Sequence, residues 1–471
     1  MNPVNWPPHY YIHQPIHFEG YISPPGSKST ANRVLPLAAV GKGSITLEGL
    51  PQGEDVRLMI EALHTLKVDI DQQTPTSCHI RGQGAAFTTS QPIHLHLGNS
   101  GTCMRFLSGL LAASQGQYTL DGVQRMRERP LGPLVEALEP LLIPLYKDKN
   151  ALSFGLTPGF PPLTLSTQGL RAGVTQLDPS LSSQFVTGIL LALPLAQGPV
   201  TLNLNAEVVS APYIALTQAL MEIWGAPLHK EATGYTCLEP KGYTNPSHYT
   251  VEPDPSSASY FLAAAALCGG PVTVKGVGHN CLQWAGEGGF ARVLEQMGAQ
   301  VQINSHTITV QAGVLKGITI NMDSMSDTAM TLAVLALFAE GPTVLTHIGN
   351  WRHKETDRLA AMACELRKCG AQVTEGEDWL SIQPLSVSPS ALHNSMTSHP
   401  SPSTHTQAVY SATPLLNDDQ YIPIHTYNDH RMAMAFTLAG LGGLPIKILN
   451  PSCVEKTYPQ YFTDMQGLCK N

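Results

Sequence analysis

Six polar clusters in the chain are rich in helix-capping residues, and three of them also carry Lys or Arg. They read GSKSTANR, GNSGTCMR, SLSSQF, DPSSASY, SMSDTAM and YNDHRM. Ser, Thr, Asn and Asp at a helix start contribute about 1 kcal/mol each as caps, and capping alone is the simplest interpretation of any single cluster. Capping does not explain Lys28, Arg33, Arg105 and Arg431, because the helix macrodipole disfavours cations at that end. An anion held by the exposed N–H groups would favour them, so the clusters predict anion-binding sites.

Further cations are concentrated in short strings. They are Arg125, Arg127 and Arg129 in QRMRERPLG, Arg352, Lys354 and Arg358 in NWRHKETDR, and Lys456 in NPSCVEKTYPQYF. A chain of net charge −8 that gathers its cations in this way is expected to bind a small, multiply anionic substrate. Charged hydrogen bonds of roughly 1.5–3 kcal/mol each would hold its phosphates and carboxylates. The alternative is a set of solvated ion pairs with Glu128, Glu355 and Asp357.

Two carboxylates lie among these cations. Asp327 is at a helix start in SMSDTAMT, and Glu355 directly follows Lys354. A carboxylate near lysine is usually part of a salt bridge. In an anion pocket it can instead act as a general acid or base, if burial raises its pKa toward neutrality. Asp327 and Glu355 are therefore candidates for proton transfer.

Composition excludes several classes of protein. The acidic balance argues against a nucleic-acid surface, and no apolar stretch approaches the roughly 20 residues needed to cross a membrane. The nine cysteines are scattered without a CxxC pair, which argues against disulfides and a structural zinc site. The start shows no signal peptide, so we expect a cytoplasmic protein.

The elements that must position these residues repeat six times. An Ala- and Leu-rich segment leads through a glycine turn into a β-branched strand, as in ANRVLPLAAV followed by GSITLEG. The segments are almost uncharged all round, which predicts buried helices. Six such units in 471 residues indicate an α/β protein, most simply two domains of three units.

One tract interrupts the repeat. Residues 384–424 are rich in Ser, Thr, Pro, Asn and His, and we expect much of this tract to be a mobile insertion. His393, His399 and His405 lie within it, but their spacing fits no known metal-ligand pattern. We therefore predict no metal site. The segment LQWAGEGGF around Trp284 reads as a smaller insertion.

Seven segments in order, PGSKS, GNSGT, RERPLG, SSQF, SDTAMTLAV, NWRHKETDR and YNDHRMAM, resemble the 3-phosphoshikimate 1-carboxyvinyltransferases (EPSP synthases). The resemblance runs from Pro24 to KTYPQYF at Lys456. It implies a two-domain inside-out α/β barrel, each domain made of three βαβαββ repeats with buried helices, and a site in the cleft between the domains. Residues 25–252 would form the N-terminal-half domain, and residues 1–24 plus 253–471 the C-terminal-half domain.

The resemblance also implies a reaction. The 5-hydroxyl of shikimate 3-phosphate would attack phosphoenolpyruvate, giving a tetrahedral intermediate that loses phosphate to leave 5-enolpyruvylshikimate 3-phosphate. This step belongs to the shikimate pathway, which leads to chorismate and the aromatic amino acids. It requires no metal or organic cofactor. A monomer is implied, with these two small molecules as its partners and neither nucleic acid nor a membrane.

Carried over motif by motif, the resemblance assigns residues to each substrate. The shikimate 3-phosphate contacts would be Lys28, Ser29, Arg33, Ser182, Ser183, Gln184, Ser210, Asp327, Asn350 and Lys354. The phosphoenolpyruvate contacts would be Lys28, Gly101, Arg129, Gln184, Arg358, Arg431 and Lys456, with Asn99 and Thr102 shaping the loop. In the implied roles Asp327 handles the hydroxyl proton and Glu355 the methylene proton, while Lys28 and Lys456 stabilise negative charge.

Three positions depart from the family pattern, and two other functions stay open. Ser100, Cys103 and Phe106 differ from the usual GNAGTAMRPL, and Phe106 leaves sensitivity to the inhibitor glyphosate open. The sister transferase that acts on UDP-N-acetylglucosamine carries a reactive loop cysteine, which DGVQRMRERPLGPLV lacks; we interpret Cys103 as structural. A non-catalytic relative would have lost Asp327, Glu355 or Lys28, and all three are present.

Overall fold

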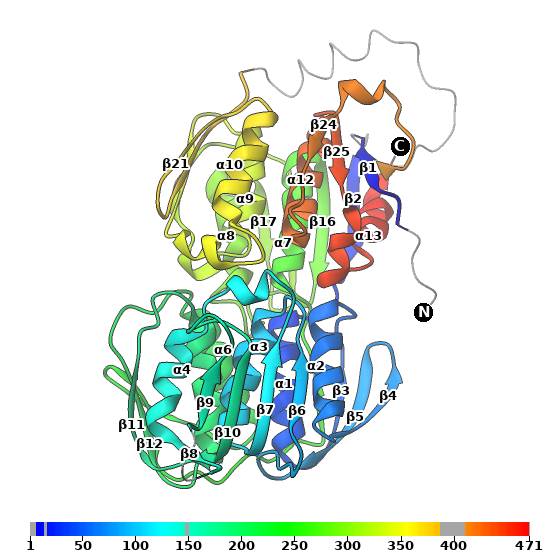
Figure 1. Cartoon of the computed structure of the whole chain (residues 1–471). Helices are drawn as coiled ribbons and strands as arrows, with labels where there is room; N and C mark the ends of the chain where they lie inside the picture. Colours follow the sequence, from blue (N-terminus) through cyan, green and yellow to red (C-terminus); the bar gives the residue numbers. More distant parts are fainter. Residues whose placement is uncertain (1–5, 14–16, 147–149, 387–409, 471) are drawn as a thin grey trace. The chain divides into compact units, whose positions relative to one another are not determined.

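The computed structural model describes residues 6–13, 17–146, 150–386 and 410–470 (Figure 1). The chain divides into two compact units. One is Gly26–Glu252, here called the central unit; the other, the terminal unit, combines Met1–Pro25 with Pro253–Asn471. Each unit has its own continuous apolar core.

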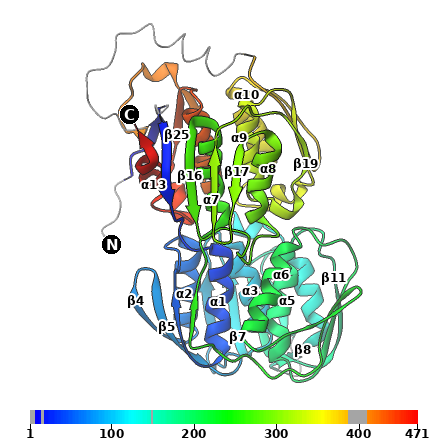
Figure 2. The same ribbon diagram turned by 180° about the vertical axis from the view of Figure 1, so that it is seen from behind.

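The central unit is built from pairs of helices, each with a strand between its members. The first helices are α1 (Lys28–Val40), α3 (Gly101–Ala112) and α5 (Ser183–Ala192). They lead into β3 (Lys42–Glu48), β7 (Gln115–Asp121) and β12 (Val200–Leu204). The second helices are α2 (Glu54–Thr65), α4 (Gly132–Leu138) and α6 (Pro212–Ile223). Helix α1 packs against α2, α3 and α6 (Figures 1 and 2).

The described strands of this unit form three sheets, and the strands pair in the same pattern in each sheet. In strand order the sheets are β15-β3-β5-β4, β6-β7-β10-β8 with β9 beside β10, and β11-β12-β14-β13. The bounds not yet given are β4 Asp69–Thr74, β5 Ser77–Gln83, β6 Ile93–His96, β8 Leu142–Pro144, β9 Leu152–Phe154, β10 Leu163–Leu170, β11 Gly173–Leu177, β13 His229–Glu231, β14 Gly234–Cys237 and β15 His248–Thr250. The strand after each buried helix has one parallel and one antiparallel neighbour.

The terminal unit repeats this arrangement. Its first helices are α7 (Pro255–Cys268), α9 (Ala329–Leu335) and α12 (His430–Leu441), followed by β16 (Gly269–Lys275), β20 (Thr343–Thr346) and β25 (Ile446–Leu449). Its second helices are α8 (Phe290–Met297), α10 (Arg358–Lys368) and α13 (Tyr461–Leu468).

The first strands of the chain complete the sheets of the terminal unit. The sheets run β17-β18-β16-β2-β26, β19-β20-β22-β21 and β23-β1-β25-β24. Here β1 (His9–Ile12) pairs antiparallel with β25, and β2 (His17–Ile22) pairs parallel with β16. The other bounds are β17 Gln300–Ile303, β18 Thr307–Gln311, β19 Thr319–Asn321, β21 Gln372–Glu375, β22 Leu380–Gln383, β23 Tyr410–Ser411, β24 Ile422–Ile424 and β26 Cys469–Lys470.

The six repeated helices are buried along nearly their whole length, as their composition predicted. Every residue of α3 and of α12 is buried, and α7 is buried from Pro255 to Ala266. Small residues allow these helices to approach closely: a Cβ at Gly109 on α3 would overlap the backbone carbonyl of Gly188 on α5. The helix–strand alternation read from the repeat is confirmed, and the protein is of the α/β class.

The tract 384–424 is only partly described. Residues 387–409, which include His393, His399 and His405, lie outside the described residues. The end of the tract is regular structure, because β23 pairs with β1 and β24 pairs with β25. Alternating isoleucines at 422 and 424 supply a strand pattern that the overall composition of the tract concealed. Within the described ranges no helix is long and apolar enough to cross a membrane.

Candidate active site

The predicted polar residues lie at the N-terminal ends of the buried helices. In the central unit, the side chains of Ser27, Ser100 and Ser182 are N-caps. They accept hydrogen bonds from the amides of Thr30 (3.2 Å), Cys103 (3.4 Å) and Gln184 (3.2 Å). The capping interpretation of these serines is therefore correct, and the cations that capping could not explain lie next to them.

Two guanidinium groups converge on the first residue of α3. A Cβ at Gly101 would lie 2.6 Å from Nη2 of Arg129 and 2.7 Å from Nη1 of Arg105. Nη1 of Arg105 donates to Oε1 of Gln184 at 2.7 Å, and Nη1 of Arg129 donates to the backbone oxygen of Asn99 at 3.0 Å. A side chain at this position would displace both guanidinium groups from the helix start. Two cations beside the N-terminus of a helix form a strong anion-binding arrangement.

The start of α1 carries Lys28 and Arg33. Nζ of Lys28 lies 3.2 Å from a carboxylate oxygen of the buried Asp55. The Arg33 guanidinium donates to the backbone oxygen of Ser29 (2.7 Å), to Oγ1 of Thr217 (2.8 Å) and to the backbone oxygen of Tyr213 (3.2 Å). Burial lowers the pKa of Arg33 to about 10. Arg33 therefore ties α1 to α6, and its contact with a substrate stays a prediction.

Arg33 also lies between two aromatic rings. Its guanidinium carbon is 5.0 Å from the ring centre of Phe106 and 5.7 Å from that of Tyr213. Phe106 is fully buried on α3. The departure from the family pattern at this position thus supplies a ring face to a buried cation.

Other predicted residues of the central unit lie on the same helix ends. Oγ1 of Thr102 accepts a hydrogen bond from Nδ2 of Asn32 at 2.8 Å, which links α3 to α1. Ser183 and Gln184 form the first turn of α5. Ser210 precedes α6 in a left-handed conformation, with φ of 56°. We call Lys28, Arg33, Arg105 and Arg129 the central cluster.

The terminal unit gathers its predicted residues around one arginine. Nε of Arg358 donates to Oδ2 of Asp429 at 2.7 Å, Nη2 donates to Oε2 of Glu355 at 2.9 Å, and Nη1 donates to Oδ1 of Asp327 at 3.0 Å. Nη2 of Arg431 reaches the other oxygen of Asp327 at 2.8 Å. We call these five residues the terminal cluster. Both proton-transfer candidates, Asp327 and Glu355, are bonded to the same guanidinium group.

The carboxylates outweigh the effect of burial on the pKa of both arginines. Burial alone would lower the pKa of Arg358, but the carboxylates of Asp429, Glu355 and Asp327 raise it overall. The pKa of Arg431 is raised in the same way, chiefly by Asp327 against the opposing effect of burial. Burial raises the pKa of the neighbouring Tyr260 to about 12. Both arginines are therefore cations at any physiological pH, and they hold Asp327 from two sides.

The other predicted residues of this unit are Lys354 and one residue in each of two 3-10 helices. Nζ of Lys354 lies 3.8 Å from Oδ1 of Asp327. Asn350 is in the 3-10 helix Gly349–His353, which packs on α10, the helix that Arg358 begins. Lys456 is buried at the end of the 3-10 helix Pro451–Lys456, which packs on α12.

Three functional candidates were missed from the sequence. Asp429 lies within YNDHRM, where the sequence indicated only a helix cap before α12. Its bond to Arg358, which the sequence did not indicate, joins residues 71 positions apart. Arg105 was noted among the cations and was not assigned to a substrate. Glu287, in the segment interpreted as a small insertion, gave no signal at all, and its carboxylate accepts hydrogen bonds from the amides of Asp327 and Thr328.

Cys103 is fully buried and its thiol donates to the backbone oxygen of Asp55 at 3.2 Å. These contacts suit a packing role. In the part of the chain that the structure describes, no group of three or more His, Cys, Asp or Glu residues is arranged to hold a metal ion.

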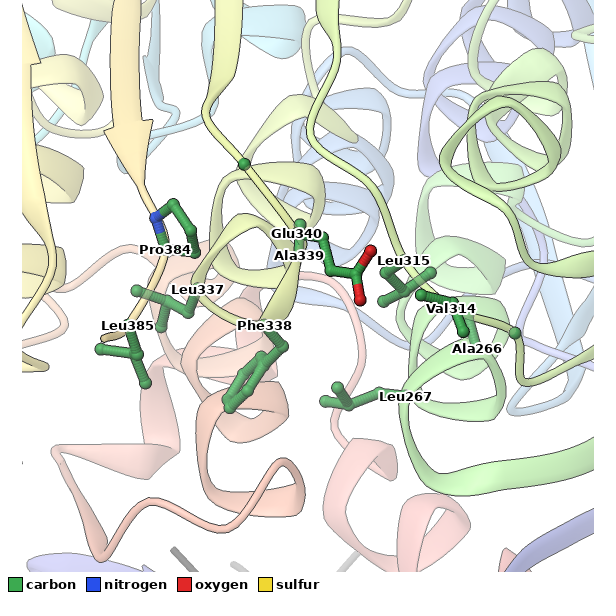
Figure 3. A pocket seen from close by; sticks show the side chains of 12 residues that line it. Ala266, Leu267, Val314, Leu315, Leu337, Phe338, Ala339, Glu340, Pro384 and Leu385 are labelled. Carbon is green, nitrogen blue, oxygen red and sulfur yellow. The ribbon is translucent and has the colours of Figure 1, made fainter. Parts of the chain in front are cut away.

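A hollow in the terminal unit lies away from the predicted residues. This cavity of about 440 Å³ is lined by the ends of α7 and of the segment after α9, including Leu267, Leu315, Leu337, Phe338 and Leu385 (Figure 3). Among the described residues that line it, Glu340 is the one with a charge. The cavity is at the C-terminal ends of these helices, whereas Asp327 and Arg431 are at helix N-terminal ends. None of the candidate residues lines it.

Each unit gathers cations at the N-terminal ends of its buried helices, and the repeated sheets and helices give an α/β architecture. The family model for EPSP synthase (3-phosphoshikimate 1-carboxyvinyltransferase) matches residues 12–465. The chain belongs to the EPSP synthase family.

Relatives and solved structures agree with this assignment. The 3-phosphoshikimate 1-carboxyvinyltransferase of Vibrio cholerae serotype O1 is 41% identical over 460 residues, covering 97% of this chain and 99% of the relative. That of Actinobacillus pleuropneumoniae is 42% identical over 457 residues, covering 96% of each. The EPSP synthase structure from Acinetobacter baumannii has a TM-score of 0.71 at 24% identity, covering 98% of both chains. The enolpyruvyl transferase NikO from Streptomyces tendae has a TM-score of 0.71 at 17% identity, covering 98% of this chain and 97% of that one. The last two likenesses concern the fold.

Proposed function

We propose that the protein transfers the enolpyruvyl group of phosphoenolpyruvate to the 5-hydroxyl of shikimate 3-phosphate and releases phosphate. The observation that carries the proposal is the pair of carboxylates, Asp327 and Glu355, bonded to the single guanidinium group of Arg358. Two proton-transfer groups held at fixed positions suit a reaction that moves one proton from a hydroxyl group and another to and from a methylene carbon.

The bonds change as follows. The 5-hydroxyl oxygen attacks C2 of phosphoenolpyruvate as its proton passes to the Asp327 carboxylate. Glu355, which enters this step as the protonated carboxylic acid, delivers its proton to C3. The resulting tetrahedral ketal then loses its phosphate group, which leaves with its bonding electron pair. A proton returns from the C3 methyl group to Glu355, which restores the double bond. Phosphate takes up the proton held on Asp327, so Asp327 ends as a carboxylate and Glu355 as a carboxylic acid, the states in which they began.

The cations bind the substrates and stabilise the developing charge. We assign shikimate 3-phosphate to Ser29, Arg33, Ser182, Ser183, Gln184, Ser210, Asn350 and Lys354, with Lys28 and Asp327. We assign phosphoenolpyruvate to Gly101, Arg129, Arg358, Arg431 and Lys456, again with Lys28 and Gln184. The convergence of Arg105 and Arg129 at Gly101 supports an anion at the start of α3, and Asn99 fixes Arg129 there. Preorganised cations of this kind lower the barrier because they need no rearrangement during the reaction.

We further propose that residues 25–252 and residues 1–24 plus 253–471 are two domains of three repeats each. We also propose that the protein is a cytoplasmic monomer that needs no cofactor. Sedimentation equilibrium at the enzyme's working concentration tests the monomer, since a dimer would double the apparent mass.

Phosphate release by the purified protein tests the proposed reaction. Release should require both shikimate 3-phosphate and phosphoenolpyruvate, and omission of either should abolish it. The Asp327→Asn variant, which removes a proton acceptor at constant size, is the matched control. Release with UDP-N-acetylglucosamine as acceptor instead would move the protein to the sister activity. Binding of both ligands without release would contradict the proposal in favour of a non-catalytic protein.

A further inference from the structure

The turn that carries Asp327 is held by side chains from two distant segments. Glu287 is 2% exposed. Its Oε1 accepts a hydrogen bond from the backbone amide of Asp327 and its Oε2 accepts one from the amide of Thr328, both at 3.1 Å. On the other side, Nε1 of the buried Trp351 donates to the backbone oxygen of Ser326 at 2.8 Å. Three consecutive residues of the backbone are thus fixed from outside.

This support adds to the local hydrogen bonds of the turn. Thr328 is the N-cap of α9, but its side chain makes no capping bond to the helix and donates instead to the backbone oxygen of Met325 at 2.9 Å. The amide of Thr328 is shared between the backbone oxygen of Met325, at 3.1 Å, and Glu287, whereas the amide of Asp327 donates to Glu287. A carboxylate suits the place because each oxygen takes one amide proton and its charge is favoured by the helix macrodipole. A glutamine side chain offers one oxygen, and its NH2 group would face the second amide.

The position of the backbone decides where the Asp327 carboxylate lies. That carboxylate spans Arg358 and Arg431, with one oxygen on each guanidinium at 3.0 and 2.8 Å. A shift of the turn would lengthen one of these bonds and turn the acceptor oxygen away from the hydroxyl group whose proton it takes. Proton transfer depends steeply on such geometry.

We propose that Glu287, supported by Trp351, is a positioning residue for Asp327. It sets the orientation of the proton acceptor and contacts neither substrate. This role rests on the proposed function, since it concerns the step in which Asp327 takes the hydroxyl proton.

A double-mutant cycle in phosphate release tests the role. We expect Glu287→Gln to lower kcat about 10- to 100-fold, with both KM values within about threefold of the wild type. In the Asp327→Asn background the same substitution should change kcat by no more than about twofold, because the group it positions is already absent. A structural role alone would give the same fold-loss in both backgrounds.

Two further variants keep the test decisive. Trp351→Phe keeps a buried ring but removes the donor to Ser326, and it should couple to Asp327→Asn in the same way if Glu287→Gln fails to fold by circular dichroism. Asp464→Asn is the matched control, because this partly buried carboxylate of the same unit accepts from Tyr458 at 2.6 Å. Its fold-effect on kcat should be equal in the two backgrounds.

The outcomes separate this role from the reaction itself. A wild-type chain without turnover on the two substrates would overturn the proposed function and the role together. A wild-type chain that turns over, with equal fold-losses from Glu287→Gln and Trp351→Phe in both backgrounds, would overturn only the positioning role.

Discussion

The central and terminal clusters both concentrate arginines at helix N-termini, and they differ in what those arginines contact. In the central cluster, Arg33 donates to a hydroxyl and two carbonyl oxygens, and Arg105 and Arg129 donate to amide and carbonyl oxygens. In the terminal cluster, Arg358 and Arg431 donate to carboxylates. Neutral oxygens orient a cation without cancelling its charge, whereas carboxylates offset it, as Asp55 does for Lys28 of the central cluster.

This difference divides the work of the proposed reaction. In the proposed reaction the central cluster binds substrate anions, and the arginines of the terminal cluster both contact phosphoenolpyruvate and hold Asp327 and Glu355 in place for proton transfer. Substitutions in the terminal cluster should therefore reduce turnover or stability, while substitutions in the central cluster should reduce the affinity for an anionic substrate.

The largest effect is expected for the two carboxylates of the terminal cluster. Asp327→Asn and Glu355→Gln should each lower kcat by about 10²- to 10⁴-fold, because each removes a group that transfers a proton. KM for both substrates should change little, since the amides keep nearly the same shape. Steady-state phosphate release measures this. Near-wild-type kcat in both variants would show that the proton transfers are made elsewhere.

The second effect is on stability and compares the two ways of neutralising a buried arginine. Arg358→Met leaves the buried carboxylates of Asp429 and Glu355 without their cation, which should cost about 3–5 kcal/mol of the free energy of unfolding. Arg33→Met leaves hydroxyl and carbonyl oxygens instead and should cost about 1–3 kcal/mol. Urea denaturation followed by circular dichroism gives both values. Equal losses would remove the distinction between the clusters.

The sequence predicted those features whose residues are close together along the chain, and it did not predict contacts between residues far apart along the chain. The buried helices were predictable because their composition is local: ten consecutive residues without a charge have one stable environment. The capping serines and the cations next to them were predictable for the same reason. The contacts of Asp429 with Arg358, and of Glu287 with Asp327, join residues 71 and 40 positions apart. No local pattern encodes them, so the support of the site required the structure.

The third effect concerns anion binding at the start of α3. Arg129→Gln should lower kcat/KM for phosphoenolpyruvate about 10- to 100-fold, the equivalent of one charged hydrogen bond of roughly 1.5–3 kcal/mol. The control is Arg127→Gln in the same RERPLG segment, where an exposed guanidinium pairs with Asp121. That variant should stay within about twofold, because exposed pairs contribute about 0–1 kcal/mol. An equal loss in both variants would point to the loop as a whole and away from Arg129.

The smallest effect tests how the central cluster holds a cation without a carboxylate. Phe106 places its ring 5.0 Å from the Arg33 guanidinium, and both side chains are buried. Phe106→Leu removes the ring face but keeps most of the apolar volume. The coupling between Phe106→Leu and Arg33→Met in the free energy of unfolding should be about 0.5–2 kcal/mol, the range of a desolvated cation–π contact. Additive losses would mean that Phe106 only fills space, and that the hydrogen bonds to Ser29, Thr217 and Tyr213 suffice to keep a charged arginine inside the unit. A measurable coupling would show that the Phe106 ring stabilises the buried Arg33 cation, which gives the bulky ring a role at this helix position.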